Sequence, residues 1–382
     1  MQYHNACLES FGYTLPTEVV TSAEIESRLA PLYRRLRLPE GRLELMTGIR
    51  ERRFWPAGTL PSDMSIASCE HALAAADVDR AEIGALIHAS VCRDHLEPAT
   101  ACRVHHALRL PSDCLIYDVS NACLGLLNGI VQLANMIELG QIRAGLVVGS
   151  EGSRQLVETT IASLNADEAL TRNQIKRAVA SLTIGSGSCA MLVTDKELSR
   201  TKNRIVAAVA RANTVHHELC HSGQDEAVAS GMQPLMQTDS ERLMQEGIAT
   251  GVETFHALLA ATGWTHDDID KTVCHQVGSA HRKLMLESLG IDPAIDFATL
   301  SWLGNTGSVA LPLTMARALE AGFIGSGDHV GMLGIGSGIN SIMLGVRWQH
   351  ALVGSADGIH DTTRRDTTRR ETAVKRLAES TK

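Results

Sequence analysis

The stretch YDVSNACLGLLNGIVQLANMIELGQ, residues 117–141, decides how the chain folds and where its chemistry lies. An apolar run that ends at Val119 meets a short Ser-Asn-Ala turn, and a helical pattern then runs from Cys123 to about Leu139. Gly140 follows at the position of a helix C-cap. The stretch therefore predicts a strand, a sharp turn and a helix whose first turn carries a cysteine.

The position of Cys123 allows two roles for its thiol. A thiol in the first turn of a helix faces unpaired backbone N–H groups and the positive end of the helix dipole, which favour the thiolate. Strand, sharp turn and helix start also present activated nucleophiles in enzymes. The alternative is an inert buried cysteine, the commoner state of an intracellular thiol. The local sequence leaves both roles open.

Two later segments favour the nucleophile. KTVCHQVGSAH, residues 271–281, contains a short apolar stretch that ends in His275, and LSWLGNTGSVALP, residues 300–312, is a glycine-bracketed loop that carries Asn305. The thirty residues between them match a strand–helix–strand excursion that brings its loops back together. Both side chains can donate to a thioester oxygen that gains negative charge. A structural histidine and an ordinary turn asparagine are the alternatives, but together with Cys123 the residues form a candidate catalytic set.

The order of five motifs resembles the ketoacyl synthase III branch of the thiolase superfamily. The motifs are TGIRERR at 47–53, DVSNACLG at 118–125, CHQVG at 274–278, GNTGSVALP at 304–312 and GMLGIGSGIN at 331–340. The resemblance covers roughly residues 1–348 and implies Claisen condensation of acyl thioesters, with Cys123 carrying the acyl group. It implies that His275 and Asn305 stabilise the enolate or its oxyanion. The backbone N–H groups of Cys123 and Gly338 would form the oxyanion hole of the acyl-enzyme.

Strands alternate with helices in two successive parts of the chain, which predicts an α/β architecture. The resemblance implies a duplicated thiolase fold, five-layer αβαβα with mixed sheets. We expect an N-terminal half at 1–200, a C-terminal half at 201–350 and a flexible tail at 351–382, because the DTTRRDTTRR repeat in that tail has nothing apolar. A helix-like insert at about 153–180 and a polar, His-rich insert at about 213–240 lie outside the repeat. These inserts are a hypothetical cap over a long acyl channel.

Glu97 separates two subfamilies. It lies in SVCRDHLEPATACR, a predicted loop in which Pro98 fixes the backbone before the next helix. The ordinary alternative is a solvated loop carboxylate. An acid here, where the fatty-acid-initiating synthases look aromatic, resembles the head-to-head acyl-CoA condensing enzymes of long-chain olefin and β-lactone biosynthesis. The resemblance implies a homodimer in which Glu97 reaches the partner subunit's site and abstracts the α-proton of a second acyl-CoA, with its pKa raised by an apolar pocket.

Arginines near the start of the chain are candidate thioester-binding residues. Arg42 stands where the initiating synthases carry a tryptophan that stacks on the adenine of coenzyme A, and a guanidinium can stack there and pair with phosphate. Arg50, Arg52 and Arg53 are further candidates for phosphate contacts, with a solvated or structurally paired basic turn as the alternative. Coenzyme A and an acyl-carrier protein both remain open as the acyl donor. We expect no cofactor besides the coenzyme A thioester substrates.

Three other functions are compatible with parts of the sequence. A decarboxylating 3-oxoacyl-[acyl-carrier-protein] synthase III would use a malonyl thioester in fatty-acid or polyketide initiation and would not need Glu97. A non-catalytic supporting subunit would have lost its nucleophile, but Cys123 is present. HELCH at 217–221 matches the H-E-x-x-H zinc-protease pattern, yet Gly223 follows too soon for the helix that this pattern needs. We therefore expect an acyltransferase without a metal.

The composition fits a soluble cytoplasmic enzyme of ordinary globular type. The net charge of −8 and the aromatic content of 3% argue against nucleic acid and anionic membrane as partners. No apolar run approaches the roughly eighteen residues that span a bilayer. Nine cysteines without regular spacing predict reduced thiols rather than a disulfide framework, which favours the cytoplasm.

Overall fold

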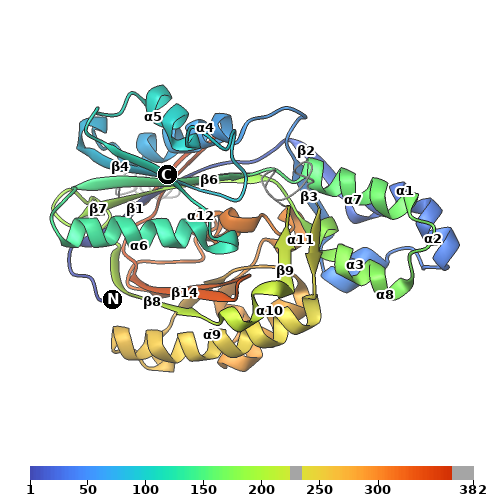
Figure 1. Ribbon diagram of the computed structural model, residues 1–382. Coiled ribbons are helices and arrows are strands. Elements are labelled where there is room, and N and C mark those ends of the chain that lie inside the picture. Colours follow the sequence, from blue (N-terminus) through green and yellow to red (C-terminus); the bar gives the residue numbers. More distant parts are fainter. Residues whose placement is uncertain (224–234, 364–382) are drawn as a thin grey trace, which may run out of the picture.

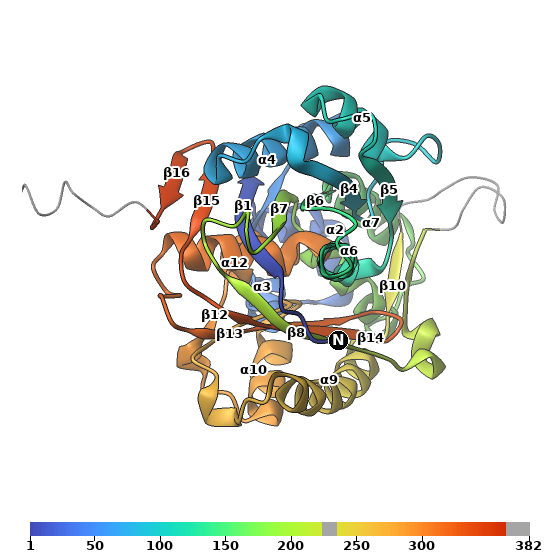
Figure 2. The same ribbon diagram turned by 90° about the vertical axis from the view of Figure 1, so that its left-hand side faces the viewer.

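The computed structural model describes residues 1–223 and 235–363 and arranges the core in layers of helices and sheets (Figure 1). Two helices cover one sheet, two cover a second sheet, and two lie between the sheets (Figures 1 and 2). In that order they are α4 (Pro61–Ala76) and α5 (Thr100–Leu108), α9 (Ser240–Thr262) and α10 (Ser279–Leu289), and α6 (Gly125–Glu138) and α12 (Ala310–Glu320). The predicted αβαβα thiolase architecture is confirmed.

The first sheet has the order β5-β4-β6-β7-β1. Its strands are β1 (Ala6–Thr14), β4 (Ile83–Ala89), β5 (Leu115–Val119), β6 (Ala144–Glu151) and β7 (Gly187–Asp195). The strands β5, β4 and β6 are parallel, whereas β7 is antiparallel to both β6 and β1. Because parallel strands end at the same edge, the loops after β4 and β5 lie on one side of the sheet.

The second sheet repeats this topology with the order β12-β11-β13-β14-β8. Its strands are β8 (Arg204–Ala212), β11 (Lys271–Cys274), β12 (Asp296–Phe297), β13 (His329–Gly336) and β14 (Asn340–Arg347). The directions repeat as well, since β12, β11 and β13 are parallel and β14 is antiparallel to β13 and β8. The two sheets are joined where β1 pairs antiparallel with β8 at Cys7 and Arg204, and the segment before β1 adds a bridge from Gln2 to Ala207. The duplication is therefore visible in the topology, although the two halves differ in sequence.

The two inner helices bury broad apolar surfaces because a sheet covers each of two faces. In α6, Leu126, Leu127, Ile130 and Leu133 are fully buried, and α12 is buried along most of its length. Helices with such surfaces are stable only inside a core. Close packing extends to Gly129, where a Cβ atom would lie 2.3 Å from a methyl group of Val147.

A lobe of short helices extends from one end of the layers (Figure 1). It contains β2 (Glu18–Thr21), α1 (Ser22–Arg28), α2 (Ala30–Leu36), α3 (Arg42–Thr47), β3 (Glu51–Phe54), α7 (Arg154–Ala166) and α8 (Arg172–Ile175). Its own core is formed by Ile25, Leu29, Phe54, Val157 and Ile161, all buried. The insert at 153–180 thus contributes α7 and α8 to this lobe.

The second insert forms a small hairpin beside the layers. After the 3-10 helix η4 (Thr214–Leu219), β9 (Cys220–Ser222) pairs antiparallel with β10 (Met236–Thr238). Residues 224–234 lie outside the described part of the chain. The side chain of Ser181 donates to the carbonyl oxygen of Met236 at 3.2 Å, so the two inserts contact each other.

The predicted start of the C-terminal tail at residue 351 is wrong. β15 (Leu352–Ser355) pairs in parallel with β1, and β16 (Gly358–Asp361) pairs with β15. Leu352 and Val353 are buried, and the adjacent Gly354 allows the strand to approach α4 so closely that a Cβ atom would lie 2.1 Å from the carbonyl oxygen of His71. Most of the DTTRRDTTRR repeat lies beyond the described residues. Among those described, no helix is both long and apolar enough to cross a membrane.

Shortening the chain to residues 1–348 should destabilise the fold, whereas ending it at residue 363 should retain β15 and β16. Leu352 and Val353 each contribute roughly 1.5–3 kcal/mol by burial, and β1 would lose its parallel neighbour. Urea denaturation of both truncated proteins measures the difference. Equal midpoints for the two would show that β15 is not an integral strand.

Candidate active site

The loops before the two inner helices meet at one cavity of about 850 Å³. Cys123 lies in the 3-10 helix η2 (Ala122–Leu124) just before α6, and Asn305 lies just before the 3-10 helix η7 (Gly307–Val309) and α12. His275 directly follows β11. All three side chains line the cavity, so the structure brings the candidate catalytic set together.

The turn at Cys123 is tighter than predicted. The α-helix begins at Gly125 rather than at the cysteine, and Ala122 has a φ of +45°, an uncommon backbone conformation for a non-glycine residue. Burial, and next the nearby Cys220 and Glu151, raise the pKa of the Cys123 thiol to about 12. The expected thiolate is therefore not the resting form, because loss of solvent outweighs the helix terminus. The thiol needs a base when it reacts.

His275 is a buried imidazole without a partner. It is 1% exposed, its backbone N–H donates to the carbonyl oxygen of Leu333 at 3.0 Å, and neither ring nitrogen has a hydrogen-bond partner among the described residues. Burial, and next the nearby His281, lower the pKa of His275 to about 3. The ring is therefore neutral at physiological pH, with one nitrogen able to donate and the other able to accept.

The loop around Asn305 fixes how its carboxamide points. The backbone N–H of Gly307 donates to Oδ1 of Asn305 at 3.0 Å, and the Asn305 main chain pairs with Thr183 at 3.0 Å and Gly185 at 2.9 Å. Within the described ranges Nδ2 has no partner and remains a donor. Gly304, with a φ of +67°, is required before it, because a Cβ atom there would lie 2.6 Å from the Thr183 carbonyl oxygen.

Gly338 and Glu97 occupy different surroundings. Gly338 lies in the turn between β13 and β14, beside the cavity-lining Ser337. In residues 1–223 and 235–363, the backbone N–H of Gly338 has no hydrogen-bond acceptor and that of Cys123 interacts only with its own thiol, so both are available to an oxyanion. Glu97 is exposed on the loop after β4 and does not line the cavity of its own chain. One subunit alone therefore does not bring Glu97 to Cys123.

The arginine predictions divide into two groups. Arg52 is wholly buried and donates to Ser22 Oγ at 3.1 Å and to the Leu182 carbonyl oxygen at 3.2 Å, and burial lowers its pKa to about 10. Arg53 likewise donates to the Pro16 carbonyl oxygen at 2.9 Å. The prediction that Arg52 binds the thioester is wrong, because the basic turn is structurally paired. Arg42 and Arg50 remain accessible candidates at the surface of the lobe.

The HELCH segment does not have the geometry of a zinc protease. Its first residues end the 3-10 helix η4, and His221 belongs to β9, so the two histidines do not share a helix face. His216 instead lies 3.2 Å from Glu246. Nowhere in the described residues do three His, Cys, Asp or Glu side chains form a group that could hold a metal ion.

Glu151 is a cavity residue that the sequence analysis did not identify. It ends β6 and accepts hydrogen bonds from the backbone N–H groups of Val91 at 3.0 Å and Cys92 at 3.2 Å. Its Oε1 also accepts from the hydroxyl of Ser308 at 2.5 Å. This buried carboxylate therefore ties the loop that leads to Glu97 to the loop that follows Asn305. Its sequence signal, one acid at the end of an apolar strand, is weak but readable.

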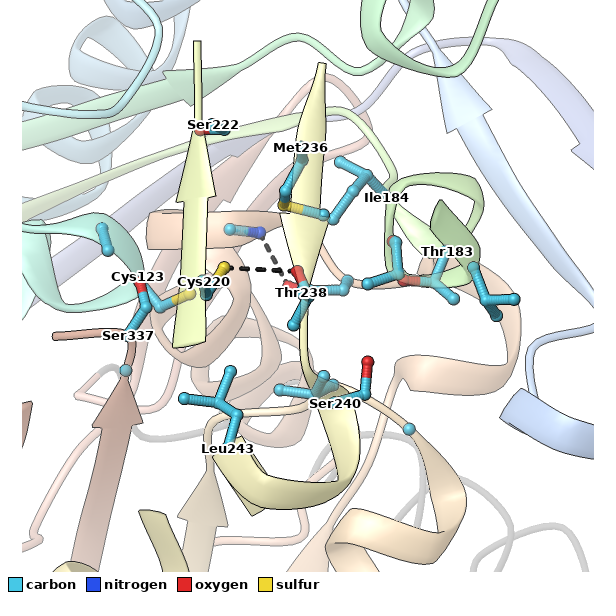
Figure 3. Close-up of a pocket in the computed structure, with 18 of the residues that line it drawn as sticks. Cys123, Thr183, Ile184, Cys220, Ser222, Met236, Thr238, Ser240, Leu243 and Ser337 are labelled. Carbon is cyan, nitrogen blue, oxygen red and sulfur yellow. Dashed lines mark hydrogen bonds between the residues drawn. The ribbon is translucent and has the colours of Figure 1, made fainter. Parts of the chain in front are cut away.

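Both inserts form walls of the cavity opposite the catalytic loops. Val179 and Ala180 come from the 3-10 helix η3 (Lys176–Thr183), and Met236 comes from the β9–β10 hairpin. Figure 3 shows Cys123 turned toward β9, where Cys220 Sγ lies 3.4 Å from the hydroxyl of Thr238. The cavity is thus covered by the segments that lie outside the duplicated topology.

A duplicated αβαβα fold with a cysteine, a histidine and an asparagine in one cavity defines a condensing enzyme of the thiolase superfamily. Residues 259–348 match the family described as 3-oxoacyl-[acyl-carrier-protein] synthase III C terminal. The chain is 44% identical over 351 residues to an acyl-CoA:acyl-CoA alkyltransferase of Shewanella oneidensis, covering 91% of this chain and 100% of the relative. It is 34% identical over 348 residues to the enzyme of that name from Xanthomonas campestris, again covering 91% and 100%.

More distant relatives and solved structures agree. A β-ketoacyl-[acyl-carrier-protein] synthase III of Rhodospirillum rubrum is 26% identical over 342 residues, which cover 90% of this chain and 97% of the relative. A crystal structure of Xanthomonas campestris OleA superposes with a TM-score of 0.85 at 33% identity, covering 91% of this chain and 99% of that chain. The chain therefore belongs to the acyl-CoA:acyl-CoA alkyltransferase (OleA) family, and it is an acyltransferase.

Replacing Glu151 by Gln should make Cys123 easier to alkylate at a given pH. The carboxylate charge raises the pKa of the thiol, so its removal should shift the alkylation profile to lower pH by less than about one unit, since burial remains the larger cause. Iodoacetamide labelling followed by mass spectrometry from pH 7 to 11 measures the shift. The exposed Glu197→Gln is the matched control, and identical profiles for the two variants would contradict the assignment.

Acid should destabilise the protein below about pH 6.5. The pKa values of His275 and His281 fall from 6.5 to about 3 and about 4, so the unfolded state binds more protons in this range. Stability should then decrease as the pH falls, by up to about 1.4 kcal/mol per pH unit for each imidazole. Urea denaturation from pH 7 to 4 of wild type and His275→Gln measures the slope. We expect a smaller slope for His275→Gln than for wild type, and an unchanged slope for the exposed control His106→Gln. A wild-type slope in His275→Gln would contradict the burial of a neutral ring.

Proposed function

We propose that the protein condenses two long-chain acyl-CoA molecules head to head, without malonyl decarboxylation, and yields a 2-alkyl-3-keto acid. The observation that carries the proposal is that the thiol of Cys123 lines a cavity of about 850 Å³ together with two side chains that are free to donate, those of His275 and Asn305. Family membership supports the same reading, since the alkyltransferases are 44 and 34% identical and the synthase III of R. rubrum is 26% identical.

The first half-reaction transfers an acyl group to Cys123. The sulfur attacks the thioester carbonyl, and the thiol proton passes to the neutral ring of His275, which has a free acceptor nitrogen. The backbone N–H groups of Cys123 and Gly338 hold the tetrahedral oxygen. Collapse of this intermediate breaks the bond to coenzyme A, whose thiolate takes the proton from His275. The products are acyl-Cys123 and free coenzyme A.

The second half-reaction needs a base for the α-proton of the second acyl-CoA. Glu151 is unsuitable, because Val91, Cys92 and Ser308 already donate to its oxygens. We assign the base to Glu97 of the second subunit in a homodimer. Leu96 precedes it on the same loop, and its apolar surface, 45% exposed, supports a subunit contact there.

Carbon–carbon bond formation follows from the enolate. His275 and Asn305 donate to the enolate oxygen, and the α-carbon attacks the acyl-cysteine carbonyl. Collapse of the second tetrahedral intermediate releases the Cys123 thiolate, which recovers a proton from the protonated Glu97. The product is a 2-alkyl-3-oxoacyl-CoA. Addition of water to its thioester gives the 2-alkyl-3-keto acid and coenzyme A.

Several features of the relatives support acyl-CoA as the substrate. Crystal structures of X. campestris OleA include one with bound cerulenin and one of a cysteine-to-serine variant with lauric acid and lauroyl-CoA. Others replace a glutamate or a histidine. We assign comparable roles here to Cys123, His275 and Glu97. The surface-accessible Arg42 and Arg50 are proposed phosphate contacts for coenzyme A or a carrier protein.

The reaction as proposed uses no resident cofactor besides its coenzyme A thioester substrates. We place the protein in the cytoplasm, where reduced thiols persist. All nine cysteines are free, which supports this location.

The substrate test is a product assay by mass spectrometry with palmitoyl-CoA alone and then with malonyl-CoA or malonyl-carrier protein added. We expect a 2-alkyl-3-keto acid, or the ketone formed by its decarboxylation, from palmitoyl-CoA alone. A product that requires malonyl thioester would instead assign the decarboxylating synthase III reaction.

The two half-reactions should separate in variants. Cys123→Ala should abolish formation of the acyl-enzyme, because no sulfur remains to carry the acyl group. Glu97→Gln should acylate at the wild-type rate but lower condensation by roughly 10²–10⁴-fold, the usual contribution of a general base. Intact-protein mass spectrometry measures acylation, and product analysis measures condensation. Glu197→Gln is the control, and loss of acylation in Glu97→Gln would contradict this division of roles.

A further inference from the structure

Three asparagine side chains form a hydrogen-bonded chain beside Cys123. Nδ2 of Asn340 donates to Oδ1 of Asn121 at 3.0 Å, and Nδ2 of Asn121 donates to Oδ1 of Asn128 at 2.7 Å. Nδ2 of Asn340 also donates to the carbonyl oxygen of Ser337 at 3.0 Å. The chain therefore runs from the first turns of α6, through the nucleophile turn, to the turn between β13 and β14.

We propose that Asn121 and Asn340 are positioning residues that hold the backbone N–H groups of Cys123 and Gly338 in register as the oxyanion hole for acyl transfer. This inference rests on the proposed function and deepens it. Asn121 precedes Cys123 by two residues, and Asn340 follows Gly338 by two residues. Neither asparagine needs to touch the substrate.

The two N–H groups need such a link because they come from different halves of the duplicated fold. Cys123 follows β5 of the first sheet, whereas Gly338 follows β13 of the second. The backbone of the Gly338 turn is held on its other side, where Ile339 and Asn213 exchange hydrogen bonds of 3.2 and 2.8 Å. In the described chain, the Asn340–Asn121 hydrogen bond is the one that joins this turn to the Cys123 turn.

The distance requirement of an oxyanion hole explains why the link matters. Both donors must lie about 2.7–3.1 Å from the oxygen as its charge develops, and a shift of about 1 Å can cost two orders of magnitude in rate. The absence of a side chain at Gly338 leaves room for the carboxamide of Asn340. A Cβ atom at Gly338 would lie 2.5 Å from Nδ2 of Asn340, so a larger residue would displace the amide that joins the turns.

The chain also determines how each amide is oriented. Asn121 accepts from Asn340 at its oxygen and donates to Asn128 at its nitrogen, so its carboxamide cannot flip without losing both hydrogen bonds. The nucleophile turn is thereby fixed to α6 and to the β13–β14 turn at once. Removing one asparagine frees the two N–H groups to move relative to each other, while the Cys123 thiol keeps its surroundings.

The test compares two reactions of Cys123 in Asn340→Ala. Acylation by palmitoyl-CoA builds an oxyanion, whereas alkylation by iodoacetamide does not. We expect single-turnover acylation to fall by about 10- to 100-fold, less than the 10²–10³-fold loss of a complete oxyanion donor, and alkylation at the same pH to stay within about twofold. Ser341→Ala is the matched control, because it removes a 2.9 Å hydrogen bond to the Gly334 carbonyl oxygen in the same hairpin without touching the Cys123 turn.

Unchanged acylation in Asn340→Ala, or an equal fall of acylation and alkylation, would overturn the proposal. Should Asn340→Ala fail to fold, Asn121→Ala breaks the same link from the other side and is judged by the same two rates. The double variant provides a further check, since acylation should fall no more than in the worse single variant if both act through one hydrogen bond; additive losses would contradict it. If the wild-type protein itself forms no acyl-Cys123, the proposed function fails rather than this inference.

Discussion

Burial of two helices between two sheets is the constraint on which the rest of the structure depends. Helices α6 and α12 occupy equivalent places in the two halves, and each is preceded by a three-residue 3-10 helix, η2 before α6 and η7 before α12. The loop before α6 carries Cys123, and the loop before α12 carries Asn305. The packing of the core therefore places the nucleophile and one donor at the same cavity.

The same duplication relates the other two candidate residues. His275 follows β11, and the loop of Glu97 follows β4, which is the strand equivalent to β11 in the first sheet. The side chain of His275, just after β11, lines the cavity of its own chain. The loop after β4 instead places Glu97 at the surface. Two equivalent positions thus acquire different tasks, one within a subunit and one, as we propose, across a dimer.

The two groups that react first, the thiol of Cys123 and the imidazole of His275, are uncharged before substrate enters. Burial raises the pKa of the Cys123 thiol to about 12 and lowers that of His275 to about 3, so both groups rest in their neutral forms. An ion pair between them would have to form in a poorly solvated cavity, which is costly. The arrangement instead supplies donors where negative charge develops during reaction, and these donors need little reorganisation.

Much of this arrangement could be predicted from the sequence because its signals are local. The pattern around Cys123 predicts the end of β5 and places both ends of α6 to within two residues, and glycines mark the loop of Asn305. Strand β1 has no such local signal, because it contains the buried acid Glu9. The carboxylate of Glu9 accepts hydrogen bonds from residues far along the chain, from Ser199 Oγ at 2.6 Å and from the Arg200 N–H at 2.8 Å. Only tertiary structure makes that burial favourable.

Other differences between the prediction and the structure also arise from tertiary packing. Arg52 belongs to a basic turn that looks solvated in sequence, but the lobe covers it. The resting protonation of Cys123 depends on burial, which no local pattern reports. The hydrogen bond from Asn340 to Asn121 joins residues 219 positions apart. Local motifs therefore predict which residues matter, whereas their protonation and mutual support follow from packing.

The most direct measurement of the central claim mixes two inactive variants. Coexpressed Cys123→Ala and Glu97→Gln subunits would form dimers in which one site combines an intact Cys123 with an intact Glu97 from its partner. We expect recovery of about a quarter of the wild-type condensation rate per subunit for random pairing in a two-fold dimer, although neither variant alone should exceed about 1% of that rate. Absence of any recovery in dimers shown to contain both subunits would contradict the assignment of Glu97 to the partner's site.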